Sequence, residues 1–106
     1  MGQPRSELPA AERALAEIRR IMRDVLGERA ATLYLFGSWA RGSATSVSDV
    51  DVAIDAHPRL PPGLLAGVRE RLEESHVPYR VEVVDLAELD PALRRRILAE
   101  GVPWSD

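Results

Sequence analysis

The sequence predicts a small α/β domain in which a mixed sheet of about three strands is flanked by helices. Short apolar runs with aromatic or β-branched residues have the length of buried strands, and segments with a helical apolar period lie before, between and after them. The 106 residues show no internal repeat and no linker long enough to divide them. We therefore expect a single domain over residues 1–106.

Three helices follow from apolar periodicity. Residues 9–27 predict an amphipathic helix, with Pro9 in its first turn and Gly27 suited to its C-terminal cap. Its apolar stripe recurs at three- and four-residue steps and comprises Ala11, Leu15, Ile18, Met22 and Val25. Two shorter helices are expected over about residues 62–75 and 91–100.

Three strands are expected between these helices. Residues 31–36, ATLYLF, and residues 50–54, VDVAI, are short apolar runs, and residues 79–86, YRVEVVDL, are rich in β-branched side chains. Residues 38–41, directly after the first strand, are expected to form one helical turn. The resulting alternation of strands and helices is typical of a layered α/β domain.

Composition narrows the classes of function. The chain has no cysteine, which excludes disulfides and thiolate metal sites. No apolar run approaches the ~20 residues that cross a bilayer, and the first residues lack the apolar core of a signal peptide, so we expect a cytoplasmic protein with no membrane partner. The net charge of −3 argues against direct nucleic-acid binding. All 14 basic residues are arginines, so a side-chain cation that binds phosphate here must be arginine.

Two acidic residues stand one residue apart at the second strand. Side chains alternate between the faces of a strand, so Asp49 and Asp51 are expected to point the same way. Two neighbouring carboxylates repel each other, and burial strengthens that repulsion unless a cation lies between them. Oxygen ligands without histidine or cysteine favour Mg²⁺, with Mn²⁺ as the alternative.

An anion site is expected where the first strand ends. Gly37 permits close approach of the backbone, and backbone amides at the start of a helical turn, together with the Ser38 hydroxyl, suit a phosphate. Arg41 follows about one turn later and could add positive charge.

Gly37-Ser38, ten intervening residues and then Asp49-x-Asp51 resembles the signature of the DNA polymerase beta-type nucleotidyltransferase superfamily. Size and element order are similar to its minimal nucleotidyltransferase (MNT) branch, antitoxin-type proteins that are paired with HEPN-domain toxins. The resemblance covers nearly the whole chain and implies a nucleotidyltransferase-like fold. It also implies that the nucleotide-binding residues are Gly37, Ser38, Arg41 and Ser48, the last through its backbone amide.

The resemblance further implies a third carboxylate on the next strand, which completes the metal site and helps to activate the attacking hydroxyl. The family usually has aspartate there, and the matching residue in this chain is Glu82. Asp85 is the nearby rival, but alternation places it on the opposite face. An exposed strand residue paired with Arg80 or Arg41 is the alternative interpretation of Glu82.

By this resemblance the chain would be a metal-dependent enzyme that uses two Mg²⁺ ions, held by Asp49, Asp51 and Glu82. It would transfer AMP from ATP (or the corresponding group of another NTP) to a hydroxyl on a HEPN toxin, a tyrosine in particular. The alternative is an antitoxin that neutralises its HEPN partner by binding alone. Nucleotidylation of a small molecule is a third possibility, although those relatives generally carry an added acceptor domain. A partner, or a homo-oligomer of the chain itself, would be needed to complete so small a site.

Other conspicuous residues are expected to have structural roles. His57 and His76 lie next to loops and are expected at the surface. Trp39 is expected to pack beneath the Gly-Ser turn, with contact to a partner as the alternative. The run Arg94–Arg96 is expected to be a solvated helix face, and Trp104 either anchors the end of the chain or meets a partner.

Overall fold

The computed structural model describes residues 10–45 and 48–104. The elements in order are α1 (Ala10–Leu26), β1 (Ala31–Phe36), α2 (Ser38–Arg41), β2 (Val50–Ala56), α3 (Leu64–Glu73), β3 (Val81–Asp85), the 3-10 turn η2 (Leu86–Glu88), α4 (Pro91–Glu100) and β4 (Val102–Pro103). Every helix and strand expected from the sequence is present, with ends shifted by at most two residues. Pro9, expected in the first turn of α1, lies outside the described residues.

The strands form one mixed sheet in the order β3-β2-β1-β4. Strand β1 runs antiparallel to both β2 and β4, whereas β2 and β3 are parallel and are joined through α3. The short strand β4 adds a fourth member to the sheet of about three strands that the sequence predicts. Just after β4, the Trp104 N–H donates to the Leu33 carbonyl at 2.6 Å, and the indole packs against the core, so Trp104 anchors this end of the described chain.

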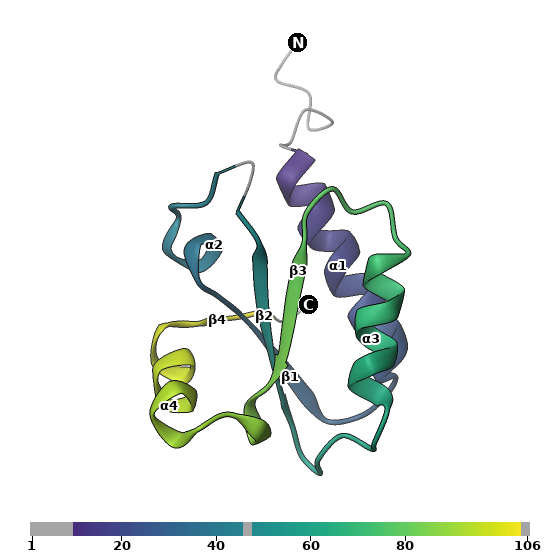
Figure 1. Cartoon of the computed structure of the whole chain (residues 1–106), viewed down its shortest axis with the longest axis vertical. Coiled ribbons are helices and arrows are strands. Elements are labelled where there is room, and N and C mark those ends of the chain that lie inside the picture. The colour runs from purple at the N-terminus through teal and green to yellow at the C-terminus, as the bar shows by residue number, and fades with distance from the viewer. Residues whose placement is uncertain (1–9, 46–47, 105–106) are drawn as a thin grey trace.

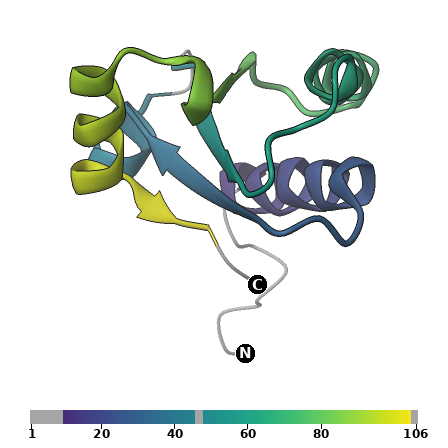
Figure 2. The same cartoon turned by 90° about the horizontal axis from the view of Figure 1, so that it is seen from below.

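The helices cover both faces of the sheet. Figures 1 and 2 show α1 and α3 side by side on one face, and α2 and α4 on the other. The main core lies between the sheet and the α1–α3 layer, and its fully buried side chains include Ile18, Met22, Leu26, Leu33, Val52, Ile54 and Val68. A smaller core of Ala53, Leu86 and Ile97 lies under α4. Among the described residues, no helix has both the length and the apolar character needed to span a bilayer.

The main core supports the strand that presents the acidic residues. Ile54 is fully buried in β2, three residues after Asp51. Ile54→Ala should lower the free energy of unfolding by about 2–5 kcal/mol, because it removes buried carbons and leaves a cavity. Urea denaturation measures this change. Leu98→Ala on α4 is the control: Leu98 is 42% exposed, and its loss should cost less than about 0.5 kcal/mol. Equal losses in the two variants would contradict the assignment of the core.

Candidate functional site

Gly37 lies directly against the carboxylate of Asp51. A Cβ atom built on Gly37 would overlap Oδ2 of Asp51 and would lie 3.2 Å from its Cγ. Gly37 also has a φ of +75°, a conformation that L side chains rarely adopt. The contact arises from strand register, because β1 and β2 pair Phe36 with Asp51 at the point where β1 enters the turn. The Gly-Ser turn and the acidic pair are therefore parts of a single site.

The turn continues into α2, as the sequence predicts. The Arg41 N–H donates to the Gly37 carbonyl at 3.2 Å, and within the described part of the chain no side chain caps the start of the helix. Trp39 packs against the main core and meets Tyr79 edge to face, with ring centroids 5.1 Å apart and planes inclined by 77°. This confirms that Trp39 packs beneath the turn. The pair fixes α2 to the segment that leads into β3.

Ser48 is hydrogen-bonded to Thr45 through both its backbone amide and its hydroxyl. Its N–H donates to the Thr45 carbonyl at 3.1 Å, and its hydroxyl accepts from the Thr45 N–H at 2.9 Å. The predicted contact between the Ser48 amide and a phosphate would therefore require the first of these bonds to open. These bonds link Ser48, the residue before Asp49, to Thr45.

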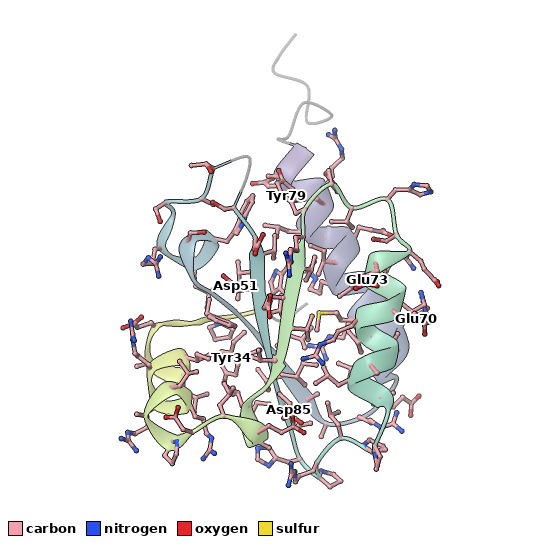
Figure 3. All side chains as sticks on the ribbon, viewed as in Figure 1. Tyr34, Asp51, Glu70, Glu73, Tyr79 and Asp85 are labelled. Atoms are coloured by element: carbon pink, nitrogen blue, oxygen red, sulfur yellow. The ribbon has the colours of Figure 1, made fainter. Side chains whose placement is uncertain are left out.

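Strand pairing brings Glu82, and not Asp85, to the side of Asp51. The parallel register of β2 and β3 pairs Asp51 with Glu82, and residues paired in this way share a face of the sheet. Asp85 pairs with Ile54 and is buried, with its carboxylate accepting from the Ala87 N–H at 3.0 Å at the start of η2. Figure 3 shows Asp51 between α2 and α4 and Asp85 at the other end of the sheet. Asp85 thus has a structural role as the cap of η2.

The negative charges are concentrated around Asp51, which is half-buried. Burial raises the pKa of the Asp51 carboxyl, the charges of Asp49 and Glu82 raise that pKa further, and the Arg41 guanidinium lowers it. A cation near Asp51 would relieve this repulsion, and the oxygen-only donors fit Mg²⁺ or Mn²⁺. In residues 10–45 and 48–104, however, no three acidic or histidine side chains form a group ready to hold a metal ion. Asp49 and Asp51 are the residues that could hold such an ion, and Glu82 pairs with Asp51 across the two strands.

Two surface predictions have different outcomes. His57 is exposed, as expected, and its Nε2 lies 2.8 Å from Oδ1 of Asp55. The prediction that Arg94–Arg96 is uniformly a solvated face is wrong for Arg94, whose Nε and Nη2 donate to the Leu86 and Leu89 carbonyls at 3.1 and 3.0 Å. Arg96 lies beside Gly37 and Arg41 around one cavity, a position that the sequence analysis missed. The sequence could not indicate this position, because a run of three arginines does not show which of them lies beside the Gly-Ser turn.

Comparison with known families gives one match over most of the chain. The family model described as polymerase beta, nucleotidyltransferase matches residues 17–103, which include every candidate site residue. The curated proteins contain no match to the chain.

Several solved structures have a similar fold. A toxin–antitoxin crystal structure with AMP-PNP matches with a TM-score of 0.70 and 26% identity, over 86% of this chain and 73% of that chain. A protein assigned as a minimal nucleotidyltransferase matches with a TM-score of 0.69 and 28% identity, over 88% of this chain and 94% of that chain. A tri-AMPylated HEPN toxin in complex with an MNT antitoxin, from Shewanella oneidensis, matches with a TM-score of 0.66 over 90% and 72% of the two chains; at 23% identity this shows the fold alone. The predicted nucleotidyltransferase-like fold is confirmed.

Proposed function

Since the chain belongs to the polymerase beta nucleotidyltransferase family, we propose that it transfers AMP from ATP to a hydroxyl group of a HEPN-domain toxin and so acts as the antitoxin of that toxin. The observation that carries the proposal is the contact between Gly37 and the Asp51 carboxylate. It supports the proposal because transfer from a polyphosphate requires a phosphate site beside the carboxylates, and the Gly37-Ser38 turn lies directly against Asp51. The similar toxin–antitoxin structure with AMP-PNP supports the choice of an adenine nucleotide and of a toxin as the partner.

The proposed reaction is an in-line displacement. A hydroxyl oxygen of the toxin forms a bond to the α-phosphorus of ATP, the bond from that phosphorus to the bridging oxygen breaks, and pyrophosphate leaves. The hydroxyl proton passes to a base, for which Glu82 is our candidate because it shares the face of Asp51. The products are the adenylylated toxin and pyrophosphate.

The other site residues would bind and orient the nucleotide. Gly37, Ser38 and Arg41 would hold its phosphates, and the Ser48 amide would join them after releasing the Thr45 carbonyl. Two Mg²⁺ ions, held mainly by Asp49 and Asp51, would supply charge neutralisation on the attacking and leaving oxygens. Cation binding would explain why these carboxylates lie together, although their repulsion lowers the stability of the folded chain.

Label transfer tests the proposal. The chain is mixed with Mg²⁺, ATP radiolabelled at the α-phosphate, and the HEPN protein encoded beside it. We expect label on the HEPN protein with the wild-type chain and none with Asp49→Ala. ATP labelled at the γ-phosphate should label nothing, because that phosphate leaves with pyrophosphate. Absence of α-label on the toxin in the presence of a stable complex would overturn the proposal.

An antitoxin that acts by binding alone is the second candidate. It is favoured by the lack of a closed three-carboxylate cluster among the described residues and by the exposure of Glu82. If the chain acts by binding alone, the double variant Asp49→Ala with Asp51→Ala should still neutralise the toxin in cells. If the chain acts as a nucleotidyltransferase, the same double variant should lose both AMP transfer and toxin neutralisation.

Glu82→Gln separates a catalytic carboxylate from an exposed strand residue. If Glu82 accepts the proton, kcat for transfer should fall by about 10²–10⁴-fold, with a much smaller change in KM for ATP. The matched control is Glu70→Gln, an exposed glutamate on α3, which should leave both parameters near their wild-type values. A kcat within twofold of the wild type for Glu82→Gln would remove Glu82 from the catalytic residues.

A further inference from the structure

A cavity of about 210 Å³ lies between the turn after β1 and helix α4. Its lining combines apolar side chains with two guanidinium groups and comprises Phe36, Gly37, Arg41, Leu93, Arg96 and Ile97, with Glu100 beside Arg96. Phe36 and Ile97 also belong to the smaller core under α4, so the cavity opens on the face of the sheet that bears Asp51.

Gly37 connects this cavity to the acidic pair. It contacts the Asp51 carboxylate and also lines the cavity. A polyphosphate with its α-phosphorus beside the carboxylates can therefore continue past Gly37 toward Arg41 and Arg96. Charge along this path changes sign, from carboxylates that would hold cations to guanidinium groups that attract anions.

We propose that Arg96 binds the terminal phosphates of the nucleotide, as a second cation beside Arg41. This inference rests on the proposed function for the identity of the nucleotide, but it concerns binding and not transfer. It assigns a ligand contact to α4, a helix that lies outside the Gly-Ser and Asp-x-Asp segments. The ligand class is a di- or triphosphate, free or attached to a nucleoside.

The three arginines of α4 differ in how much freedom they have to bind a ligand. Arg94 is fixed on two backbone carbonyls at the end of η2. Arg95 is exposed and is not part of the cavity lining. Arg96 lines the cavity, and its Nε lies 4.0 Å from a Glu100 oxygen, with the two side chains 73% and 61% exposed. Such an exposed pair is weak, so a phosphate with several charges can displace Glu100.

This arrangement predicts discrimination by phosphate number. ATP, pyrophosphate and tripolyphosphate would reach Arg96, whereas the single phosphate of AMP, bound near the carboxylates, would not. The same contact would retain pyrophosphate after transfer, so pyrophosphate should inhibit the enzyme competitively against ATP. Tripolyphosphate is the probe of choice, because it has the phosphate chain without the nucleoside.

The test is calorimetric titration of the full chain, with Mg²⁺ present, by ATP, tripolyphosphate and AMP. Arg96→Ala should weaken the binding of ATP and tripolyphosphate by about tenfold, the loss of roughly one charge-assisted contact, and should leave AMP unchanged. Arg96→Lys should retain most of the affinity. Arg95→Ala is the matched control on the same helix and should bind all three ligands like the wild type.

The outcomes separate this inference from the proposed function. If Arg96→Ala binds ATP and tripolyphosphate as well as Arg95→Ala does, or if the wild type binds no polyphosphate, the inference is overturned. A selective loss with Arg96→Ala supports it, even if the wild type transfers no label to a HEPN protein; that last result would overturn only the proposed function. Because Arg96 is 73% exposed, the variants should keep the wild-type Tm, and this checks that they are folded.

Discussion

Asp51→Asn should abolish nucleotidyl transfer while making the metal-free protein more stable. Asparagine keeps the size of the side chain but removes the charge that would hold a cation beside the α-phosphate, so we expect transfer to fall by roughly a thousandfold or more. Stability should rise because the folded protein holds the Asp51 carboxylate in an unfavourable place, half-buried and facing the charges of Asp49 and Glu82. An uncharged amide does not experience that repulsion.

The stability gain should depend on pH in a defined direction. Burial and the neighbouring carboxylates raise the pKa of Asp51 in the folded state above its ordinary value of 3.8. The favourable protonated form is thus fully present below that ordinary value and is lost as the pH rises through the raised pKa. In the presence of a chelator, the Tm values of Asp51→Asn and the wild type should converge in acid and separate by a few degrees toward neutral pH. Parallel Tm curves at all pH values would contradict this account.

Asp55→Asn provides the matched control for Asp51→Asn. Asp55 lies on the same strand and face, and its Oδ1 lies 2.8 Å from Nε2 of His57. Asp55→Asn should not raise the Tm at neutral pH, because it weakens the contact with His57 and leaves Asp51 between Asp49 and Glu82. Transfer activity should stay near that of the wild type. A gain in Tm equal to that of Asp51→Asn would point to net charge, not to the local cluster.

The helices and the longer strands were predictable because each depends mainly on the residues within its own segment. The apolar period defined α1 and α4, and the apolar run at 50–54 and the β-branched run at 79–86 defined β2 and β3 to within two residues. Strand β4 has two residues, too few for any periodicity, and it is held through β1 and the Trp104–Leu33 hydrogen bond. Its existence depends on long-range pairing, which local patterns do not contain.

The site was predictable where it follows from alternation along a strand. Alternation places Asp85 on the face opposite Glu82, as predicted. The choice of Glu82 came from the family resemblance, and the parallel register of β2 and β3, which alternation does not determine, pairs Glu82 with Asp51. The contact of Gly37 with Asp51 needed the register between β1 and β2, which spacing suggests but does not determine. The different positions of Arg94 and Arg96 needed the rotation of α4 on the sheet, set by burial of Ile97 in the smaller core.

Of the glycine-to-alanine substitutions around α2, Gly37→Ala should cause the larger loss of both stability and activity. Two costs add at this position. The backbone of Gly37, with φ +75° and ψ −152°, lies in a region almost confined to glycine and is unfavourable for alanine by roughly 1–3 kcal/mol. The new Cβ would also overlap Oδ2 of Asp51. Relief of that overlap must displace the carboxylate or the turn, so transfer should fall by at least about a hundredfold. Urea denaturation and the label-transfer assay measure the two effects.

Gly42→Ala is the control for a methyl group that meets no neighbour. Gly42 has φ +76° and ψ 15°, and a Cβ there would meet nothing within 4 Å among the described residues, so its substitution should cost only the roughly 1–2 kcal/mol of alanine in the left-handed region. Because the ψ of Gly37 is −152°, its backbone cost differs, and a double-mutant cycle is needed to isolate the overlap with Asp51. Adding Asp51→Ala to Gly37→Ala removes the overlapping carboxylate and leaves the Asp51 Cβ at 3.5 Å, an ordinary contact. Gly37→Ala should therefore cost less stability in the Asp51→Ala background than in the wild type, a coupling energy between the two sites, and activity should not return. An equal cost in the two backgrounds would mean that the turn and the Asp51 carboxylate are not in contact, and the shared site would have to be abandoned.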